Sequence, residues 1–231
     1  MPVVLLHDSL GCVGLWRDFP AELAARLGCP VIAYDRLGFG RSSARDAAPS
    51  PRFIEEEAES AFPALRKALD LGEFRLFGHS VGGSMVLAIA ANGDGCLGVV
   101  SESAQPYVEQ RTLDGIRMAE ARFARPEEFA RLARWHGDNA HWVLRGWIDT
   151  WLSPAYADWN LDAVLRRVAC PVLAVHGEND EFGSVAFPAH IVSRVAGPAK
   201  ELVLADCGHV PHREMPDVVL RRVAACFGEK A

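Results

Sequence analysis

The chain has 231 residues, half of them hydrophobic, and a formal net charge of -6 at pH 7. That length is enough for one sizeable domain with its own core. The negative charge argues against nucleic acid or an anionic membrane as the main partner, and no apolar run is long enough to span a bilayer.

The N-terminus has neither the basic region nor the small-residue cleavage site of a signal peptide, so we expect a cytoplasmic protein. The six cysteines are scattered without a C-x-x-C pair, which is more typical of reduced core residues than of disulfides or a zinc site. No motif for a metal or a cofactor stands out, and we expect neither.

Short apolar runs predict six strands, at residues 2–6, 31–34, 74–77, 97–100, 171–175 and 201–205. Apolar residues at helical spacing predict helices between most of these runs, at residues 16–27, 53–71, 85–91, 185–195 and 216–227. We expect the second of these helices to bend at Pro63. The alternation predicts an α/β fold, a mainly parallel sheet of about six strands with helices on both faces.

The pattern changes between residues 105 and 167, where no strand is predicted. Helical spacing recurs at residues 112–123, 127–135, 140–152 and 161–168, and five of the six tryptophans fall in this stretch. We interpret 105–167 as a helical cap insertion, because it is short for an independent domain. The core domain then consists of two parts, residues 1–104 and 168–231.

The sequence Gly78-His79-Ser80-Val81-Gly82 lies between the third predicted strand and an apolar helix. This is the context of a nucleophile elbow, in which the chain turns sharply with the serine at its apex. The two glycines lack the Cβ atoms that would clash in so tight a turn. The pentapeptide alone also fits an ordinary glycine-rich turn, so the interpretation depends on finding partners for Ser80.

A serine hydroxyl needs a base within hydrogen-bond reach and an acid that orients the base. His209 follows the last predicted strand and is the best candidate for the base, with His212 as its nearest rival. Asp180 follows the fifth strand and is the candidate acid, with Glu102 after the fourth strand as the alternative. The order serine, aspartate, histidine along the chain is that of one known triad architecture.

These motifs resemble those of the α/β-hydrolase-fold serine hydrolases, and the resemblance covers nearly the whole chain. It implies that Ser80 is the nucleophile, His209 the base and Asp180 the orienting acid. The segment 34–42 resembles the family's Asp-x-x-Gly-x-Gly-x-Ser turn, which is structural there. The family's two oxyanion donors, both backbone N–H groups, would be those of Ser9 and Val81.

Two departures from the family pattern are visible. Most members carry His-Gly after the first strand, whereas this chain has His7-Asp8. Members normally open with a β-hairpin, whereas this sequence begins at the strand itself, so we expect either a trimmed sheet with the 31–34 strand at its edge or an incomplete start. The segment 9–11 together with Trp16 resembles the enol-lactonase branch over a short stretch.

The leading functional prediction is a hydrolase that cleaves a carboxylic ester or lactone of a small, mostly apolar substrate. Carbon–carbon bond hydrolysis on the same fold and non-hydrolytic ligand binding stay open as alternatives. A serine nucleophile excludes the branches that use aspartate, the dehalogenases and epoxide hydrolases. Three tryptophans of the cap would wall the pocket, although packing between cap helices would explain them equally well: Trp142, Trp147 and Trp151.

Overall fold

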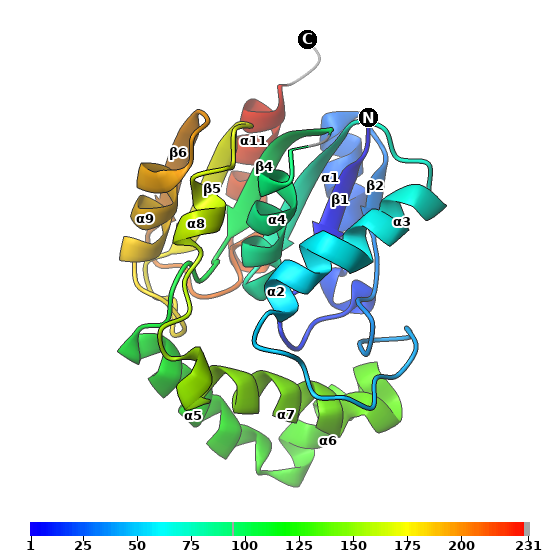
Figure 1. The fold of residues 1–231 in the computed structure, drawn as a ribbon, viewed down its shortest axis with the longest axis vertical. Helices are drawn as coiled ribbons and strands as arrows, with labels where there is room; N and C mark the ends of the chain where they lie inside the picture. The colour runs from blue at the N-terminus through cyan, green and yellow to red at the C-terminus, as the bar shows by residue number, and fades with distance from the viewer. Residues whose placement is uncertain (94, 229–231) are drawn as a thin grey trace.

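The computed structural model describes residues 1–93 and 95–228. Its centre is a six-stranded sheet in the order β2-β1-β3-β4-β5-β6, in which every pair of neighbours is parallel (Figure 1). This confirms the predicted sheet, with β2 at one edge. The strands are β1 (Val3–Leu6), β2 (Val31–Ala33), β3 (Phe74–His79), β4 (Cys96–Glu102), β5 (Val172–Gly177) and β6 (Ala199–Leu204).

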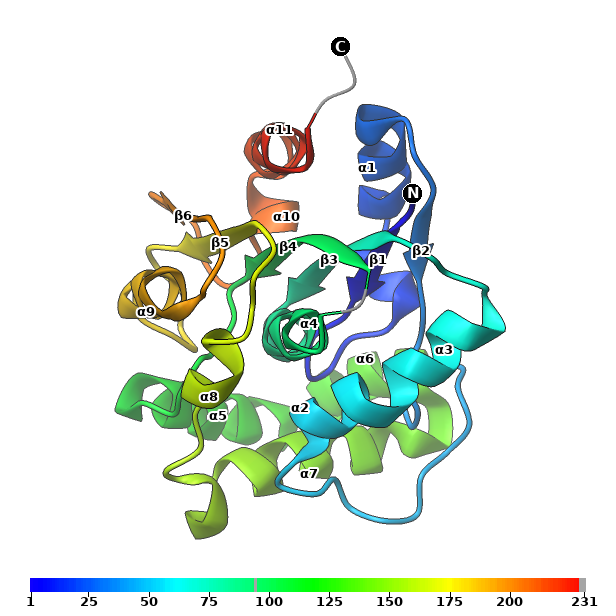
Figure 2. The ribbon, with the colours of Figure 1, turned by 45° about the horizontal axis from the view of Figure 1, so that its top comes forward.

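Helices cover both faces of the sheet (Figure 2). One face carries α1 (Phe19–Leu27), α10 (Pro211–Glu214) and α11 (Pro216–Phe227). The other carries α2 (Phe53–Glu56), α3 (Phe62–Ala68), α4 (Val81–Ala91), α8 (Asp162–Leu165) and α9 (Ala186–Arg194).

Strand β1 is apolar throughout because both of its faces are covered. Val3 and Leu5 belong to the core on the α1 and α11 side, while Val4 and Leu6 belong to the core on the α4 side. Successive side chains of a strand point to opposite faces, so a strand covered on both sides is apolar at every position.

Two predicted helices are interrupted. The helix expected at residues 16–27 begins only at Phe19, because a 3₁₀ turn ends at Trp16 and Arg17 has a φ of 52°. The helix expected at residues 53–71 is divided by a π-helical turn, Glu57–Ala61, directly before Pro63. Proline has no N–H to donate to the preceding turn, which explains why the regular hydrogen bonding changes there.

The insertion between β4 and β5 is helical. Helices α5 (Gln110–Phe123), α6 (Pro126–His136) and α7 (Ala140–Trp151) lie across the carboxyl ends of the strands, and α8 returns to the sheet beside α4 (Figure 1). An antiparallel bridge between Tyr107 and Asn160 joins the entering and leaving segments. The division into core and cap at residues 105–167 stays a prediction. No helix in the described ranges is long and apolar enough to cross a membrane.

Candidate active site

The loop between β3 and α4 is a sharply strained turn with Ser80 at its apex. Ser80 has a φ of 55° and a ψ of -123°, a conformation that non-glycine residues rarely adopt. A Cβ atom on Gly78 would lie 2.1 Å from the Gly82 carbonyl oxygen, and one on Gly82 would lie 2.1 Å from the Leu6 oxygen. The backbone therefore passes so close to its neighbours that only glycine fits on either side of the serine.

His209 and Asp180 meet at the ends of β5 and β6. His209 Nδ1 lies 2.8 Å from each carboxylate oxygen of Asp180, whose side chain is fully buried. The Phe182 N–H donates to Asp180 Oδ1 at 2.8 Å and fixes the carboxylate. Two loops far apart in the sequence thus form the pair that the sequence predicted.

The charges of this pair shift both pKa values. Burial alone would raise the pKa of Asp180, but the positive charge and hydrogen bond of His209 outweigh it and lower the pKa. Burial alone would lower the pKa of His209, but the Asp180 carboxylate outweighs it and raises the pKa. The carboxylate therefore holds a proton on Nδ1 and leaves the other ring nitrogen free.

Ser80 and His209 line the same cavity, of about 110 Å³, together with Ser9, Trp147 and Trp151. Among the described residues no hydrogen bond joins the Ser80 hydroxyl to the His209 ring. Such contacts are often long in structures without substrate and tighten when a substrate binds. The structure thus brings Ser80, His209 and, through His209, Asp180 to one place.

The two predicted oxyanion donors lie at this cavity or at the larger one beside it. Ser9 lines the small cavity and an adjoining larger one, and Val81 lines the larger one. Val81 is the first residue of α4, where backbone N–H groups have no partner within the helix. No acceptor in the described part of the chain pairs with either N–H, so both are available to a ligand.

Asp8, which replaces the family's usual glycine, has a defined structural role. Its Oδ1 accepts from the Leu10 N–H at 2.8 Å, and its Oδ2 lies 3.6 Å from His79 Nδ1. Burial would raise the pKa of Asp8, but its interaction with His79 outweighs burial and lowers the pKa. The carboxylate is therefore ionised and closes the turn after β1.

Glu102 and His212, the alternative acid and the rival base, pair with each other. Glu102 Oε2 lies 2.5 Å from His212 Nδ1, and both side chains are buried. Neither lines the cavity that holds Ser80. Burial lowers the pKa of His212 more than Glu102 raises it, so the imidazole is neutral. The side chains of both alternatives thus form a separate buried pair outside the cavity of Ser80, although the Glu102 backbone oxygen accepts from the Ser80 N–H at 2.8 Å.

His79 is a site residue that the sequence analysis did not identify. Its Nε2 lies 2.8 Å from the His209 backbone oxygen and donates to it, which holds the loop of the candidate base. The ligand atoms of His79, Glu102 and His212 lie within 4.8 Å of one another, close enough to be considered for a metal ion. Because His79 Nε2 and His212 Nδ1 are already hydrogen-bonded, we interpret this group as part of the protein's own bonding.

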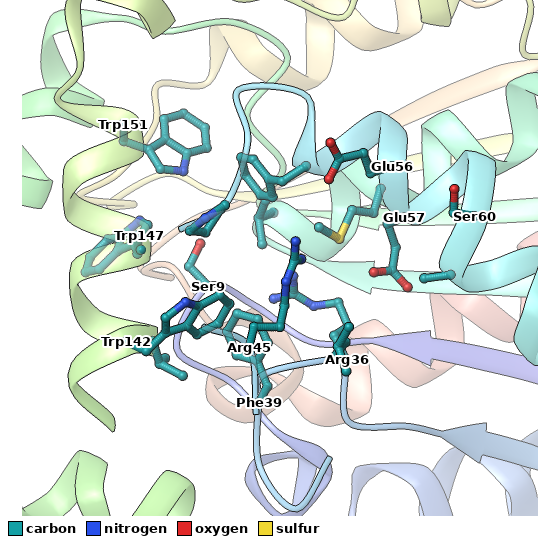
Figure 3. A pocket seen from close by; sticks show the side chains of 18 residues that line it. Ser9, Arg36, Phe39, Arg45, Glu56, Glu57, Ser60, Trp142, Trp147 and Trp151 are labelled. Atoms are coloured by element: carbon teal, nitrogen blue, oxygen red, sulfur yellow. The ribbon is translucent and has the colours of Figure 1, made fainter. Parts of the chain in front are cut away.

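A larger cavity of about 400 Å³ adjoins the one that holds Ser80, and Ser9, Trp147 and Trp151 line both (Figure 3). The three tryptophans of α7 form one wall, with Trp142 facing only this larger space. Charged side chains also line this cavity: Arg36, Glu56 and Glu57, and Arg45, whose guanidinium lies 5.9 Å from the centre of the Trp142 ring. Trp151 also packs inside the cap, with its ring 5.2 Å from that of Tyr156.

A third space, a groove of about 280 Å³, is also lined by His209. It shares His209, Asp8 and Arg122 with the cavity that holds Ser80. Arg131 and Arg213 also line it, together with the carboxylates of Asp8 and Glu128, and Glu128 pairs with Arg131 at 2.7 Å.

A sequence model of the alpha/beta hydrolase family matches residues 3–222. A proline iminopeptidase from Lactiplantibacillus plantarum is 40% identical over 86 residues, which are 37% of this chain and 29% of that protein. A human (lyso)-N-acylphosphatidylethanolamine lipase is 39% identical over 83 residues, which are 36% of this chain and 23% of that protein. The chain therefore matches less than a third of the length of these curated relatives.

Solved structures show the same fold over nearly the whole chain. The 2-hydroxy-6-oxo-6-phenylhexa-2,4-dienoate hydrolase from a Rhodococcus species superimposes with a TM-score of 0.78 at 18% identity, covering 98% of this chain and 90% of that one. The enol-lactonase from Burkholderia xenovorans gives a TM-score of 0.73 at 20% identity, covering 99% and 91%. Because the family model spans almost every residue and the fold agrees, this chain belongs to the alpha/beta hydrolase family of enzymes.

Proposed function

We propose that this protein is a serine hydrolase that cleaves a carboxylic ester or lactone of a small, mostly apolar substrate through an acyl-enzyme. One observation carries the proposal. The His209 ring is held 2.8 Å from both oxygens of the buried Asp180 and lines the same cavity as Ser80, the residue at the strained apex.

In this mechanism the Ser80 hydroxyl attacks the substrate carbonyl, and His209 Nε2 takes its proton. Asp180 stabilises the imidazolium that forms, and the N–H groups of Ser9 and Val81 bind the oxyanion. The tetrahedral intermediate collapses when His209 gives the proton to the leaving oxygen. A water molecule, deprotonated by His209, then attacks the acyl carbon; as the bond to Ser80 breaks, His209 returns the proton to the Ser80 oxygen and the acid leaves.

The cavities suggest how a substrate lies. The leaving group receives its proton from His209, so it should extend along the groove that shares His209 with the catalytic cavity. The acyl part should then extend past Ser9 into the larger cavity, whose volume of about 400 Å³ suits a small molecule. There Trp142, Trp147 and Trp151 would contact it.

The test uses a fluorophosphonate probe, which reacts with activated serines, on the wild type and on Ser80→Ala. We expect labelling of the wild type alone, followed by turnover of p-nitrophenyl esters with an optimum at short or medium chain length. Absence of labelling in the wild type would refute an activated Ser80.

Labelling without turnover of any ester or lactone would instead favour carbon–carbon bond cleavage or ligand binding. Proline p-nitroanilide belongs in the same panel, because one relative is a proline iminopeptidase. Faster turnover of that amide than of every ester would contradict the ester assignment.

A further inference from the structure

The peptide group between Asp8 and Ser9 is held by three donors. Its carbonyl oxygen accepts from Arg36 Nη2 at 2.8 Å, from His7 Nδ1 at 2.9 Å and from the Gly11 N–H at 3.2 Å. The N–H of the same peptide is that of Ser9, the proposed oxyanion donor. Because a peptide group is planar, donors that fix its oxygen also fix the direction of its N–H.

The contacts of His7 define its protonation. The Arg36 backbone N–H donates to His7 Nε2 at 3.1 Å, so Nε2 is an acceptor. A neutral imidazole with an accepting Nε2 carries its proton on Nδ1 and donates it, here to the Asp8 oxygen. Burial lowers the pKa of His7 well below its ordinary value, and the charge of Arg36 lowers it further, which keeps the ring neutral.

Arg36 places a buried positive charge against this peptide. Its side chain is 5% exposed, its guanidinium lies 4.2 Å from the centre of the Phe39 ring, and in the described residues no carboxylate comes within ion-pair distance of it. A guanidinium stays charged even when buried. Charge-assisted hydrogen bonds are about twice as strong as neutral ones, and they are stronger still where water is excluded.

The loop that carries Arg36 is itself fixed. Asp35 accepts from the N–H groups of Val13 at 2.6 Å and Arg41 at 2.9 Å, and the Ser42 hydroxyl donates to the Asp35 oxygen at 2.6 Å. The Asp-x-x-Gly-x-Gly-x-Ser turn, predicted to be structural, thus holds the Arg36 guanidinium beside the turn after β1.

We propose that Arg36, together with neutral His7, positions and polarises the Asp8–Ser9 peptide so that the Ser9 N–H is aligned with the developing oxyanion. Electron density drawn toward the carbonyl oxygen leaves the N–H more positive, since the two are conjugated across the amide. Arg36 is a positioning residue that acts through this peptide. The inference rests on the proposed function and adds Arg36, a residue outside the candidate triad, to its mechanism.

The test compares Arg36→Met and Arg36→Lys with Arg41→Met, an exposed arginine of the same loop that lines none of the three cavities. We measure kcat and KM for p-nitrophenyl acetate and the inhibition constant of phenylboronic acid, whose serine adduct places an oxygen where the oxyanion forms. Loss of one oxyanion donor costs about 100- to 1000-fold, so we expect a misaligned one to lower kcat by about 10- to 100-fold.

KM should stay within about threefold, because the interaction exists only in the transition state. The boronic acid should lose affinity by the same factor as kcat, Arg36→Lys should recover part of both, and Arg41→Met should match the wild type. A kcat within about twofold of wild type for folded Arg36→Met, or an equal rise in KM without loss of boronic acid affinity, would overturn the inference.

A crystal structure of the wild type with the boronic acid tests the inference even if neither variant folds. The boronate oxygen should accept from the Ser9 N–H while the Asp8 oxygen still accepts from Arg36; a Ser9 N–H turned away from it overturns the inference. Failure of the proposed function gives a different result, because the wild type itself would then hydrolyse no ester.

Discussion

Replacing Asp180 by asparagine tests the catalytic arrangement most directly, because it replaces one carboxylate oxygen by an NH₂ group and removes the negative charge. The Phe182 N–H donates to Oδ1 at 2.8 Å, so the asparagine oxygen should occupy that position. The amide NH₂ would then face His209 Nδ1 and force the ring proton onto Nε2. In that tautomer His209 has no free nitrogen with which to take the proton of Ser80.

The magnitude follows from the distance. At 2.8 Å and an effective dielectric constant of about 20, the attraction between the Asp180 carboxylate and the imidazolium is about 6 kcal/mol. A loss of that size corresponds to about 10⁴-fold in kcat, which agrees with the effect of the same change in other serine hydrolases.

The assay is steady-state hydrolysis of a p-nitrophenyl ester, with Glu102→Gln as the matched control. That variant makes the same chemical change at a buried carboxylate that also pairs with a histidine. We expect Asp180→Asn to lower kcat by about 10⁴-fold and Glu102→Gln by less than about tenfold. A reversed order of the two losses would refute the reasoning and assign the acid to Glu102.

Three further predictions follow from the same geometry. Gly82→Ala should fold poorly, since its Cβ would lie 2.1 Å from the Leu6 oxygen. The control Gly72→Ala, whose Cβ would meet nothing within 4 Å, should have the melting temperature of the wild type. Equal melting temperatures for the two variants would contradict the described elbow. Esters with an anionic leaving group should have a lower KM than matched neutral esters at low salt, because arginines line the groove proposed for the leaving group. Arg122→Met or high salt should reduce this difference in KM. An unchanged ratio of the two KM values would exclude binding of the leaving group by the arginines of the groove. The free energy of unfolding should fall as the pH drops below about 6.5, because the unfolded chain then binds more protons than the folded one. Four histidines have folded-state pKa values below their unfolded values: His7, His136, His176 and His212. Urea titrations at pH 7 and pH 5 measure this, and a higher free energy of unfolding at pH 5 would contradict it.

The sequence predicted the sheet and the candidate triad because both leave local marks. Apolar runs report burial on two faces, and the glycines around Ser80 report a turn that only glycine permits. The candidate base and acid could be named because parallel strands bring the loops after their carboxyl ends to one edge.

The remaining contacts leave no such mark. Nothing in the local sequence indicates that Glu102 faces His212, or that His79 donates to the His209 carbonyl oxygen. Side-chain pairing across distant loops depends on the rotation of each loop, which hydrophobic periodicity does not report. The break at Arg17, by contrast, has a local mark that the helical spacing overrode: Pro20 lies in the first turn of α1 and has no N–H to donate to the Trp16 oxygen.

The bridge between Tyr107 and Asn160 joins the two ends of the helical insertion, whose contribution to the site differs from that of the sheet. Ser80, Asp180 and His209 all follow strands of the sheet, whereas the tryptophan wall comes from α7, on the far side of that bridge. On the proposed function, exchange of side chains on α7 would change which acyl groups the cavities accept, while the three triad candidates keep their places at the strand ends. New specificity can arise on this scaffold by drift in one helix.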